Sequence, residues 1–536
     1  MFPNPSRPSV MKHDFTMVPK ADIPRSQFNR SHGYKTALAM AGVLYPFFCD
    51  EVLPGDTMNL KPTIFARLST PIVPFMDNLY LSTFWFFCPM RLVWTNYDKF
   101  FGAQANPGDS VSYNMPQFTP YNCVAESLSD YFGIPPLAGG ATKAHVSLPH
   151  RAYNKIWNDW FRCEYLQDSV TVDLGDGPDS ISNYVLKQRG KAKDYFTSGL
   201  PWTQKFTAQS VPLTGTAPVK GIAIDQTAAY ASTPTTVRDY TGSVPTGNNW
   251  SSAGGGPLNI SVAGSGTSPN AYPQIYADLS SATAVTINAL RQSFQIQKMY
   301  ERDARGGTRY VETILSHFGV RGDDLRLNRP QYLGGGKAPI MINPVAATAF
   351  TSGANALGRL AGAGYVTHHG MGFVQSFTEH GYIIGLVCID ADLTYQQGLD
   401  RMWSRSTRAD LYWPVLAHLG EQSILNQEIY LQGSANPTQD AATFAYQERY
   451  AEYRFKNSMI TGKMRSTYSA PLDHWHLSQK FTSLPTLGDT FIKSIPPVDR
   501  VVAVNTEPQM FLDAYFDYKC TRPMPVYSVP GLVDHF

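Results

Sequence analysis

The chain is poor in charged residues. Asp, Glu, Lys and Arg make up 16% of its 536 residues, whereas about 25% is typical of soluble proteins. It also has no run of about 18 apolar residues, the length that a bilayer-spanning helix requires. Its densest apolar stretches, Phe84–Phe87 and Tyr382–Ile389, have the length of strands. We therefore predict a protein without membrane insertion whose surface carries few charges.

Cysteine motifs and targeting signals are also missing. The six cysteines, at positions 49, 88, 123, 163, 388 and 520, form no CxxC pair. This spacing favours buried free thiols over a disulfide framework or a zinc site. The N-terminal sequence MFPNPSRPSVMKHDF lacks the charged and apolar regions of a signal peptide. We predict a cytoplasmic, reducing setting.

The motifs of the common enzyme classes do not occur either. The chain has no GxSxG and no HExxH. Leu333–Ala338 resembles a phosphate-binding loop, but Gln331 replaces the first glycine and Ala338 replaces the Ser or Thr that would hold magnesium. A glycine turn beside a strand is the favoured interpretation. We predict no catalytic residue, no cofactor and no metal.

The net charge is only +2. A protein that neutralises nucleic acid alone usually has a strongly basic tail or face. The nearest candidate is the N-terminal arm, residues 1–33, whose basic excess is modest. We predict Arg25, Arg30 and Lys35 as DNA-facing residues. If nucleic acid is bound, counterions or a second, more basic protein must neutralise most of its charge.

Aromatic residues, in contrast, reach 13%, and the chain has 42 Gly and 39 Pro. Low charge with many aromatic side chains is typical of surfaces buried between subunits. A large monomeric β-protein with an aromatic core would have the same composition. Composition alone leaves both interpretations open.

Strand patterns dominate both ends of the chain. Between residues 58 and 68 the even positions are apolar and most odd positions are polar, which predicts a strand with one buried face. Pro62 within it predicts a bulge or an edge position. Leu79–Cys88 is apolar at both odd and even positions, as in a strand covered on both faces. Further candidate strands are Tyr382–Ile389, Ala451–Phe455, Val501–Val504 and Met510–Tyr518.

Helical patterns appear in the middle of the chain. Apolar spacing predicts helices over residues 147–166, with Ser147 as cap, and over 308–318, ended by Gly319. A third helix is predicted to begin near Ile287.

The stretch 170–286 is rich in Gly, Ser, Thr, Ala and Pro. Its short alternating pieces, Val219–Ile224 and Leu258–Val262, favour a surface insertion with its own small β-structure over a disordered linker. Its aromatic residues Tyr230, Tyr240 and Trp250 are candidates for exposed contacts.

Two segments interleave arginine with aromatic residues, namely Arg401–Arg405 and Arg449–Arg454. Such groups can stack on and neutralise a single-stranded nucleic acid. They can equally pack arginine against aromatic rings at a protein interface, which is the interpretation we favour.

Several long segments resemble the major capsid protein of gokushovirus-type microviruses. They are RSQFNRSHGYKT (25–36), DEVLPGDTMNL (50–60), FARLSTPIVPFMDNLYLSTFWFFCPMRLVWTNYDKF (65–100), the stretch from SFTEHGYIIGLVCIDADLTYQQGLDRMWS to LNQEIY (376–430), YAEYRFKNSMITGKMRS (450–466), FTSLPTLGDTFIKSIPPVDRVV (481–502) and RPMPVYSVPGLVDHF (522–536). The likeness spans most of the chain outside about 170–286. Cys88 and Met90 depart from the expected valine and asparagine and look like packing variants.

The resemblance implies a mainly β fold, an eight-stranded antiparallel jelly roll of the viral capsid type with long loop insertions that contain several helices. The implied parts are an N-terminal arm (1–33), the first part of the jelly roll (34–169), a surface insertion that forms a three-fold protrusion (170–286), a helical insertion (287–336), and the second part of the jelly roll with a C-terminal arm (337–536).

The function implied is self-assembly into a T=1 icosahedral shell around circular single-stranded DNA, with the insertion contacting the host. The implied partners are further copies of the chain at five-, three- and two-fold contacts, single-stranded DNA, a small basic DNA-binding protein, a pilot protein, an internal scaffolding protein and a host receptor. The protein would be a virion component assembled in the bacterial cytoplasm. The alternative is a monomeric carbohydrate-binding β-protein that uses exposed aromatic residues such as Trp250.

Overall fold

A computed structural model describes residues 24–69, 71–210, 286–324, 326, 328–348 and 356–527, with short strands between 219 and 277. The chain divides into two units, one formed by residues 1–203 and 304–536 and the other by residues 204–303. The larger unit is built mainly from antiparallel β-sheets, so the predicted mainly β fold is confirmed.

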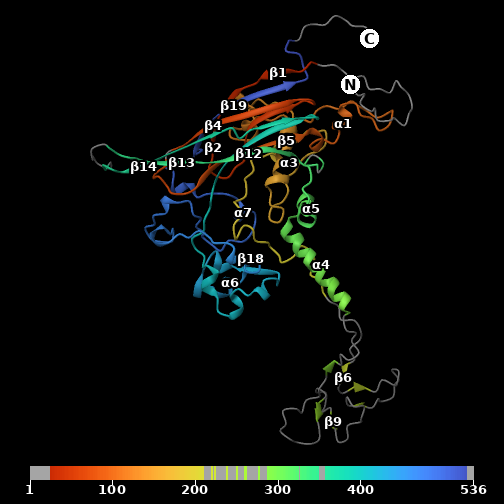
Figure 1. The fold of residues 1–536 in the computed structure, drawn as a ribbon, viewed down its shortest axis with the longest axis vertical. Helices are drawn as coiled ribbons and strands as arrows, with labels where there is room; N and C mark the ends of the chain where they lie inside the picture. Colours follow the sequence, from red (N-terminus) through yellow and green to blue (C-terminus); the bar gives the residue numbers. More distant parts are fainter. Residues whose placement is uncertain are drawn as a thin grey trace. The chain divides into compact units, whose positions relative to one another are not determined.

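The larger unit contains two main sheets, whose strands come from three separate parts of the chain, residues 26–89, 331–391 and 510–522 (Figure 1). One sheet has the order β1-β19-β4-β14-β13, with β2 also paired to β19 and β15 to β4. The other has the order β12-β5-β16-β3. The strands of the first sheet are β1 (Ser26–Asn29), β2 (His32–Leu38), β4 (Thr57–Leu68), β13 (Met341–Ala346), β14 (Leu360–His369), β15 (Phe373–Ser376) and β19 (Met510–Arg522). Those of the second are β3 (Tyr45–Val52), β5 (Leu79–Pro89), β12 (Gln331–Pro339) and β16 (Gly381–Ala391).

The larger unit also contains shorter elements. They are α1 (Tyr97–Phe100), α2 (Leu128–Tyr131), α3 (Leu148–Ile156), α5 (Tyr310–Phe318), α6 (Pro437–Asp440), α7 (Asp489–Ile492) and the paired strands β17 (Glu421–Leu425) and β18 (Thr443–Glu448).

The main core lies between the two sheets. The ring of Phe516 on β19 lies 5.4 Å from that of Phe47 on β3 and 6.1 Å from that of Trp85 on β5. The even positions of β4 supply buried side chains to this core, whereas its odd positions are exposed or half-buried. The predicted alternation over residues 58–68 is therefore confirmed.

The two central strands of the four-stranded sheet are buried on both faces. β5 and β16 are almost wholly buried, as predicted, because α3 and the surrounding loops cover the side away from the main core. The Tyr153 hydroxyl on α3 donates to the Leu44 carbonyl at 2.8 Å. The predicted helix 147–166 is shorter in the structure: α3 is followed only by a π-helical turn, Trp157–Phe161. Ser147 is the N-cap residue, but its hydroxyl bonds to the Pro116 carbonyl instead of capping the helix.

Pro62 lies inside β4 and not in an edge strand. β14 pairs with β4 as far as Thr63, and β15 resumes the pairing at Leu60. Residues 370–372 therefore stand opposite Lys61 and Pro62, one residue more than the pairing requires, as in a β-bulge. Of the two positions predicted for Pro62, the structure has the bulge.

The glycines of Leu333–Ala338 lie within strand β12, so the predicted glycine turn is wrong. β12 pairs with β5 through this run, with a register shift between Tyr332 and Gly334. A Cβ on Gly335 would overlap the Thr83 carbonyl oxygen, and one on Gly336 would overlap the Met371 sulfur. Close packing inside the strand requires these glycines.

Two predicted strands near the C-terminus are also wrong. Residues 451–453 form a 3-10 turn, because Tyr450 adopts a positive φ of 63° and redirects the chain after β18. Val501 and Val502 are buried, but they follow another 3-10 turn and form no strand. Ala451, Val501 and Val502 thus reach the core from turns, whereas Tyr453 and Phe455 are exposed. The predicted strand at Met510–Tyr518 is confirmed as part of β19.

The remaining predicted helices are confirmed. α5 ends at Gly319, whose φ of 69° allows a left-handed C-cap. α4 spans Ile287–Gly306, and only Ala304 among its residues is buried. Within the smaller unit, the rings of Phe206 and Tyr300 lie 4.9 Å apart.

The smaller unit also contains paired short strands. They are β6 (Val219–Lys220), β7 (Ala223–Ile224), β8 (Val237–Arg238), β9 (Asn249–Ser251), β10 (Asn259–Ser261) and β11 (Tyr276–Ala277). β9 pairs with β10, β6 with β11 and β7 with β8. β structure therefore occurs at both pieces where the sequence predicts it, Val219–Ile224 and Leu258–Val262.

The six cysteines are free. Four are buried as predicted, Cys163 is half-buried and Cys49 is exposed. In the described part of the chain, every helix is too short or too polar to cross a bilayer.

Candidate assembly surface

The two arginine and aromatic segments come together around a loop formed by residues 401–419. Three short 3-10 turns shape this 401–419 loop: Arg401–Ser404, Arg408–Asp410 and Pro414–Leu416. The Asp400 carboxylate accepts the Met402 N–H at 3.0 Å, and Asp410 accepts the Thr407 N–H at 2.7 Å. The hydrogen bond from the Thr407 N–H, the largest influence, and another from the Ser406 N–H lower the pKa of Asp410. The loop therefore has a defined conformation without being a regular helix or strand.

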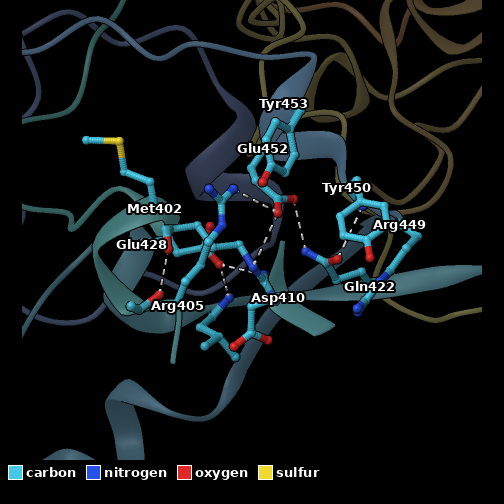
Figure 2. A network of polar contacts seen from close by, with 12 residues as sticks. Met402, Arg405, Asp410, Gln422, Glu428, Arg449, Tyr450, Glu452 and Tyr453 are labelled. Carbon is cyan, nitrogen blue, oxygen red and sulfur yellow. Dashed lines mark hydrogen bonds and ion pairs between the residues drawn. The ribbon is translucent and has the colours of Figure 1, made fainter. Parts of the chain in front are cut away.

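Buried ion pairs attach the loop to two glutamate side chains from later segments of the chain (Figure 2). Arg401 lies 3.0 Å from a carboxylate oxygen of Glu428, and Arg405 lies 3.4 Å from one of Glu452. The second oxygen of Glu452 accepts the Gln422 amide at 3.1 Å. Both carboxylates are almost fully buried. Because a buried charge without a partner is costly, this arrangement strongly favours one position of the loop.

Burial raises the pKa of the Glu428 carboxyl, and the nearby Arg401 and a hydrogen bond from the Leu425 N–H act in the opposite direction. The Tyr195 hydroxyl donates to Glu428 at 2.9 Å. The carboxyl group is therefore surrounded by donors from three parts of the chain.

Arginine also stacks on aromatic rings here. The Arg405 guanidinium lies 4.3 Å from the ring centre of Tyr453, and that of Arg449 lies 4.7 Å from the ring of Tyr450. Such stacking stabilises the arginine side chain in one orientation. The basic groups are thus engaged with carboxylates and rings of their own chain. This favours the predicted protein interface over nucleic-acid binding.

The outer side of the loop is apolar and exposed. Trp403 is 70% exposed and Val415 is 88% exposed. The other large apolar side chains that are exposed on the loop are Met402, Leu411, Tyr412, Trp413 and Leu419. The nine residues 411–419 contain no Asp, Glu, Lys or Arg. A rigid surface of Trp, Tyr, Met and aliphatic side chains over buried, neutralised charges is suited to binding another protein surface.

The predicted DNA-facing residues bind groups of their own chain in this structure. Arg25 donates to the Gly55 carbonyl, Arg30 pairs with Asp50, and Lys35 lies 2.7 Å from Asp513. The three residues lie in or beside β1 and β2, at the edge of the seven-stranded sheet. Their contact with DNA stays a prediction.

The predicted host-contact residues are only partly within the described structure. Trp250 lies in β9, opposite Ile260 of β10. Tyr230 and Tyr240 lie outside the described residues. Their contact with the host also stays a prediction. Among the residues that the structure describes, no three His, Cys, Asp or Glu side chains gather to hold a metal ion.

Other features of the structure were not predicted from the sequence. One is the buried pair of Arg151 on α3 and Asp179, 2.6 Å apart and almost inaccessible to solvent. Another is the β13–β14 hairpin, which carries exposed apolar residues. The sequence feature that could have indicated this exposed hairpin is its near absence of charge, since Arg359 is the single charged residue between 338 and 365.

Two packed sheets and an exposed apolar loop held by ion pairs define the class: a β-rich protein with a surface suited to binding other protein surfaces. Comparison with known proteins agrees with this class. The model of the capsid protein (F protein) family matches residues 16–532. The chain is 43% identical to capsid protein VP1 of Bdellovibrio phage phiMH2K and 42% identical to capsid protein VP1 of Chlamydia phage 1, over 98% of each pair. It is 36% identical to capsid protein VP1 of Spiroplasma virus 4, covering 98% of this chain and 99% of the relative.

The chain therefore belongs to the capsid protein (F protein) family. The predicted resemblance to the capsid proteins of gokushovirus-type microviruses is confirmed.

Proposed function

We propose that this protein is the major capsid subunit of a small bacterial virus and that copies of it assemble into a closed T=1 icosahedral shell. The observation that carries the proposal is relatedness along the whole chain: three proteins named capsid protein VP1 match 98% of it. The exposed 401–419 loop, held by buried ion pairs, supports self-association as the activity.

We propose an eight-stranded jelly roll as the fold of the shell domain. Support comes from the alternation of strands between the two sheets. β2, β4, β14 and β19 belong to one sheet, and β3, β5, β12 and β16 belong to the other. The orders β2-β19-β4-β14 and β3-β16-β5-β12 are those of two interleaved Greek keys.

The content of the shell would be a circular single-stranded DNA genome. The net charge of +2 supports a division of labour in which a small basic protein neutralises most of the phosphates. Arg25, Arg30 and Lys35 remain our candidates for direct contact with the DNA. A pilot protein and an internal scaffolding protein are the further partners we propose, with assembly in the host cytoplasm.

The 170–286 insertion would form a protrusion at the three-fold axes and contact a receptor on the host. Exposed apolar residues along α4 support clustering of copies, because Ile287, Leu290 and Phe294 recur at helical spacing and are 69%, 41% and 66% exposed. Such a stripe on an exposed helix is suited to packing against the same helix of other copies.

We propose that the role is structural and not enzymatic. The alternative, a monomeric carbohydrate-binding protein, would also use exposed aromatic residues. The exposed aromatic residues Trp403, Tyr412 and Trp413 lie among exposed aliphatic side chains, and Arg408 stacks on Trp413 at 4.6 Å, an arrangement that fits burial against protein better than contact with a polar sugar.

The test is assembly of the full-length protein with its scaffolding partner. We expect closed icosahedral particles by electron microscopy and a particle mass that corresponds to the T=1 lattice. A protein that stays monomeric under these conditions, and binds glycans as a monomer, would support the alternative.

A further inference from the structure

The β13–β14 hairpin is the starting point, because it extends past the sheet to which it belongs. The two strands pair from Met341 with Tyr365 to Ala346 with Leu360. β14 pairs with β4 only from Gly364 onward, where β4 ends at Leu68. The outer part of the hairpin, including Val345 and Leu360, therefore has no partner strand in β4. Figure 1 shows both strands at one end of the seven-stranded sheet.

The surface of this hairpin is apolar and exposed. Met341 is 57% exposed, Val345 51% and Leu357 65%. Five of the six residues of β13 are exposed, and in the described part of the chain no strand pairs with its outer edge. Natural proteins usually protect such an edge with charged residues or cover it, because a bare edge pairs with other chains. Here neither β13 nor the first five residues of β14 has a charged side chain.

The chemistry of the hairpin restricts what it can bind. Arg359, which directly precedes β14, is the single charged residue between 338 and 365, so the hairpin has little charge with which to attract phosphate groups or a basic protein. Apolar side chains gain most by burial against other apolar side chains. The same chain offers such a surface in residues 411–419, where five of nine side chains are large, apolar and exposed and Arg408 stacks on Trp413 at its margin.

Both surfaces are exposed in the single chain, so they do not cover each other within one copy. From these observations we infer that the β13–β14 hairpin of one subunit docks on residues 411–419 of a second copy of this chain. The inference rests on the proposed function and adds the pair of surfaces that meet. The contact joins two different surfaces and is heterologous, a type of contact that closes into rings when the rotation between subunits allows it.

The experiment uses full-length chains with opposite charges placed on the two surfaces. One variant carries Val345→Asp and Leu360→Asp in the hairpin, and another carries Val415→Lys and Leu419→Lys in the loop. We expect each to remain a folded monomer, with a melting temperature close to wild type and at least a tenfold loss of particles. Charged side chains buried in an apolar contact without partners are unfavourable.

The decisive variant combines all four substitutions, so that Asp faces Lys at every contact between copies. We expect it to regain particles, at least tenfold above either double variant. The matched control combines the hairpin substitutions with Val415→Asp and Leu419→Asp, and we expect it to remain unassembled. Normal particle yield from the hairpin variant, or no recovery in the Asp–Lys combination, overturns the inference. Wild-type assembly in the same experiment separates this outcome from failure of the proposed function.

Discussion

At the scale of single residues, the chain satisfies its buried charges internally. The guanidinium of Arg151 binds Asp179 and also donates to the carbonyl oxygens of Val93 and Gly175 at 3.0 and 2.8 Å. Arg401 and Arg405 are held in the same way by Glu428 and Glu452. A charge satisfied in this manner fixes the positions of the segments that supply its partners.

His150 is a buried titratable group outside this pattern. Its Nε2 lies 2.9 Å from the Ser129 hydroxyl, and its ring lies 4.9 Å from those of Phe118 and Phe132. Burial lowers the pKa of His150 to about 3, and the neighbouring His145 acts in the same direction. In the unfolded chain the imidazole has its ordinary pKa of about 6.5.

We predict that protonation of His150 destabilises the unassembled subunit at acidic pH. Between about pH 6.5 and pH 3 the unfolded state binds a proton that the folded state does not bind. The stability due to the neutral imidazole is therefore complete above pH 6.5 and falls as the pH is lowered, by up to about 1.4 kcal/mol per pH unit. Urea unfolding at several pH values measures this slope.

Two variants give the comparison for His150. In His150→Gln the slope of the unfolding free energy against pH, between pH 6.5 and pH 4, should decrease by the contribution of nearly one proton. The exposed His418 provides a matched control, and His418→Gln should keep the wild-type slope. Parallel curves for wild type and His150→Gln would contradict the assignment.

At the scale of elements, the glycines of β12 determine how closely this strand packs. We predict that Gly335→Ala destabilises the subunit by about 1–3 kcal/mol, because its new methyl group overlaps the Thr83 carbonyl of β5. Thermal unfolding measures the loss.

Gly108→Ala is the matched control for this substitution. No atom lies within 4 Å of a Cβ at Gly108, so its melting temperature should stay close to wild type. Equal melting temperatures for the two variants would show that β12 and β5 adjust without cost.

The strands of both sheets that could be predicted from the sequence are those with a regular pattern. β4 has a period of two because its two faces meet different surroundings, and β5 is apolar throughout because both of its faces are covered. β12 was missed because three glycines carry no pattern. Ala451–Phe455 imitated a strand, since alternation can also arise where a turn places Glu452 beneath Arg405.

The candidate surface was predicted only in part. The interleaving of arginine with aromatic residues marks Arg401–Arg405 and Arg449–Arg454, but their meeting depends on contacts between distant segments. The partners of Arg151 and of the β13–β14 hairpin depend in the same way on tertiary structure. A single sequence contains no direct signal for such pairs.

At the scale of the whole molecule, the chain has a densely packed larger unit and a smaller unit rich in Gly, Ser, Thr and Ala. Among the described residues, three clusters of buried apolar side chains lie in the larger unit, whereas residues 204–303 form a unit of their own. One side chain of the larger unit, Tyr165, contacts the chain both just before and just after this insertion. The Tyr165 ring lies 4.8 Å from that of Trp202, and its hydroxyl donates to the Ala304 carbonyl at 2.8 Å. The two ends of the insertion are therefore close together.

This proximity leads to the prediction that residues 208–299 can be replaced by a short Gly–Ser linker without loss of the larger unit. Because both ends contact Tyr165, a short linker closes the gap at a small entropic cost. We expect the shortened protein to keep its β-sheet circular dichroism and a cooperative thermal transition.

If the insertion contacts the host, virus carrying this subunit should lose adsorption to cells. A control removes only residues 262–275, between β10 and β11. Unchanged adsorption by particles of the shortened protein would exclude the host-contact role, whereas an unfolded shortened protein would show that the insertion is required for the fold.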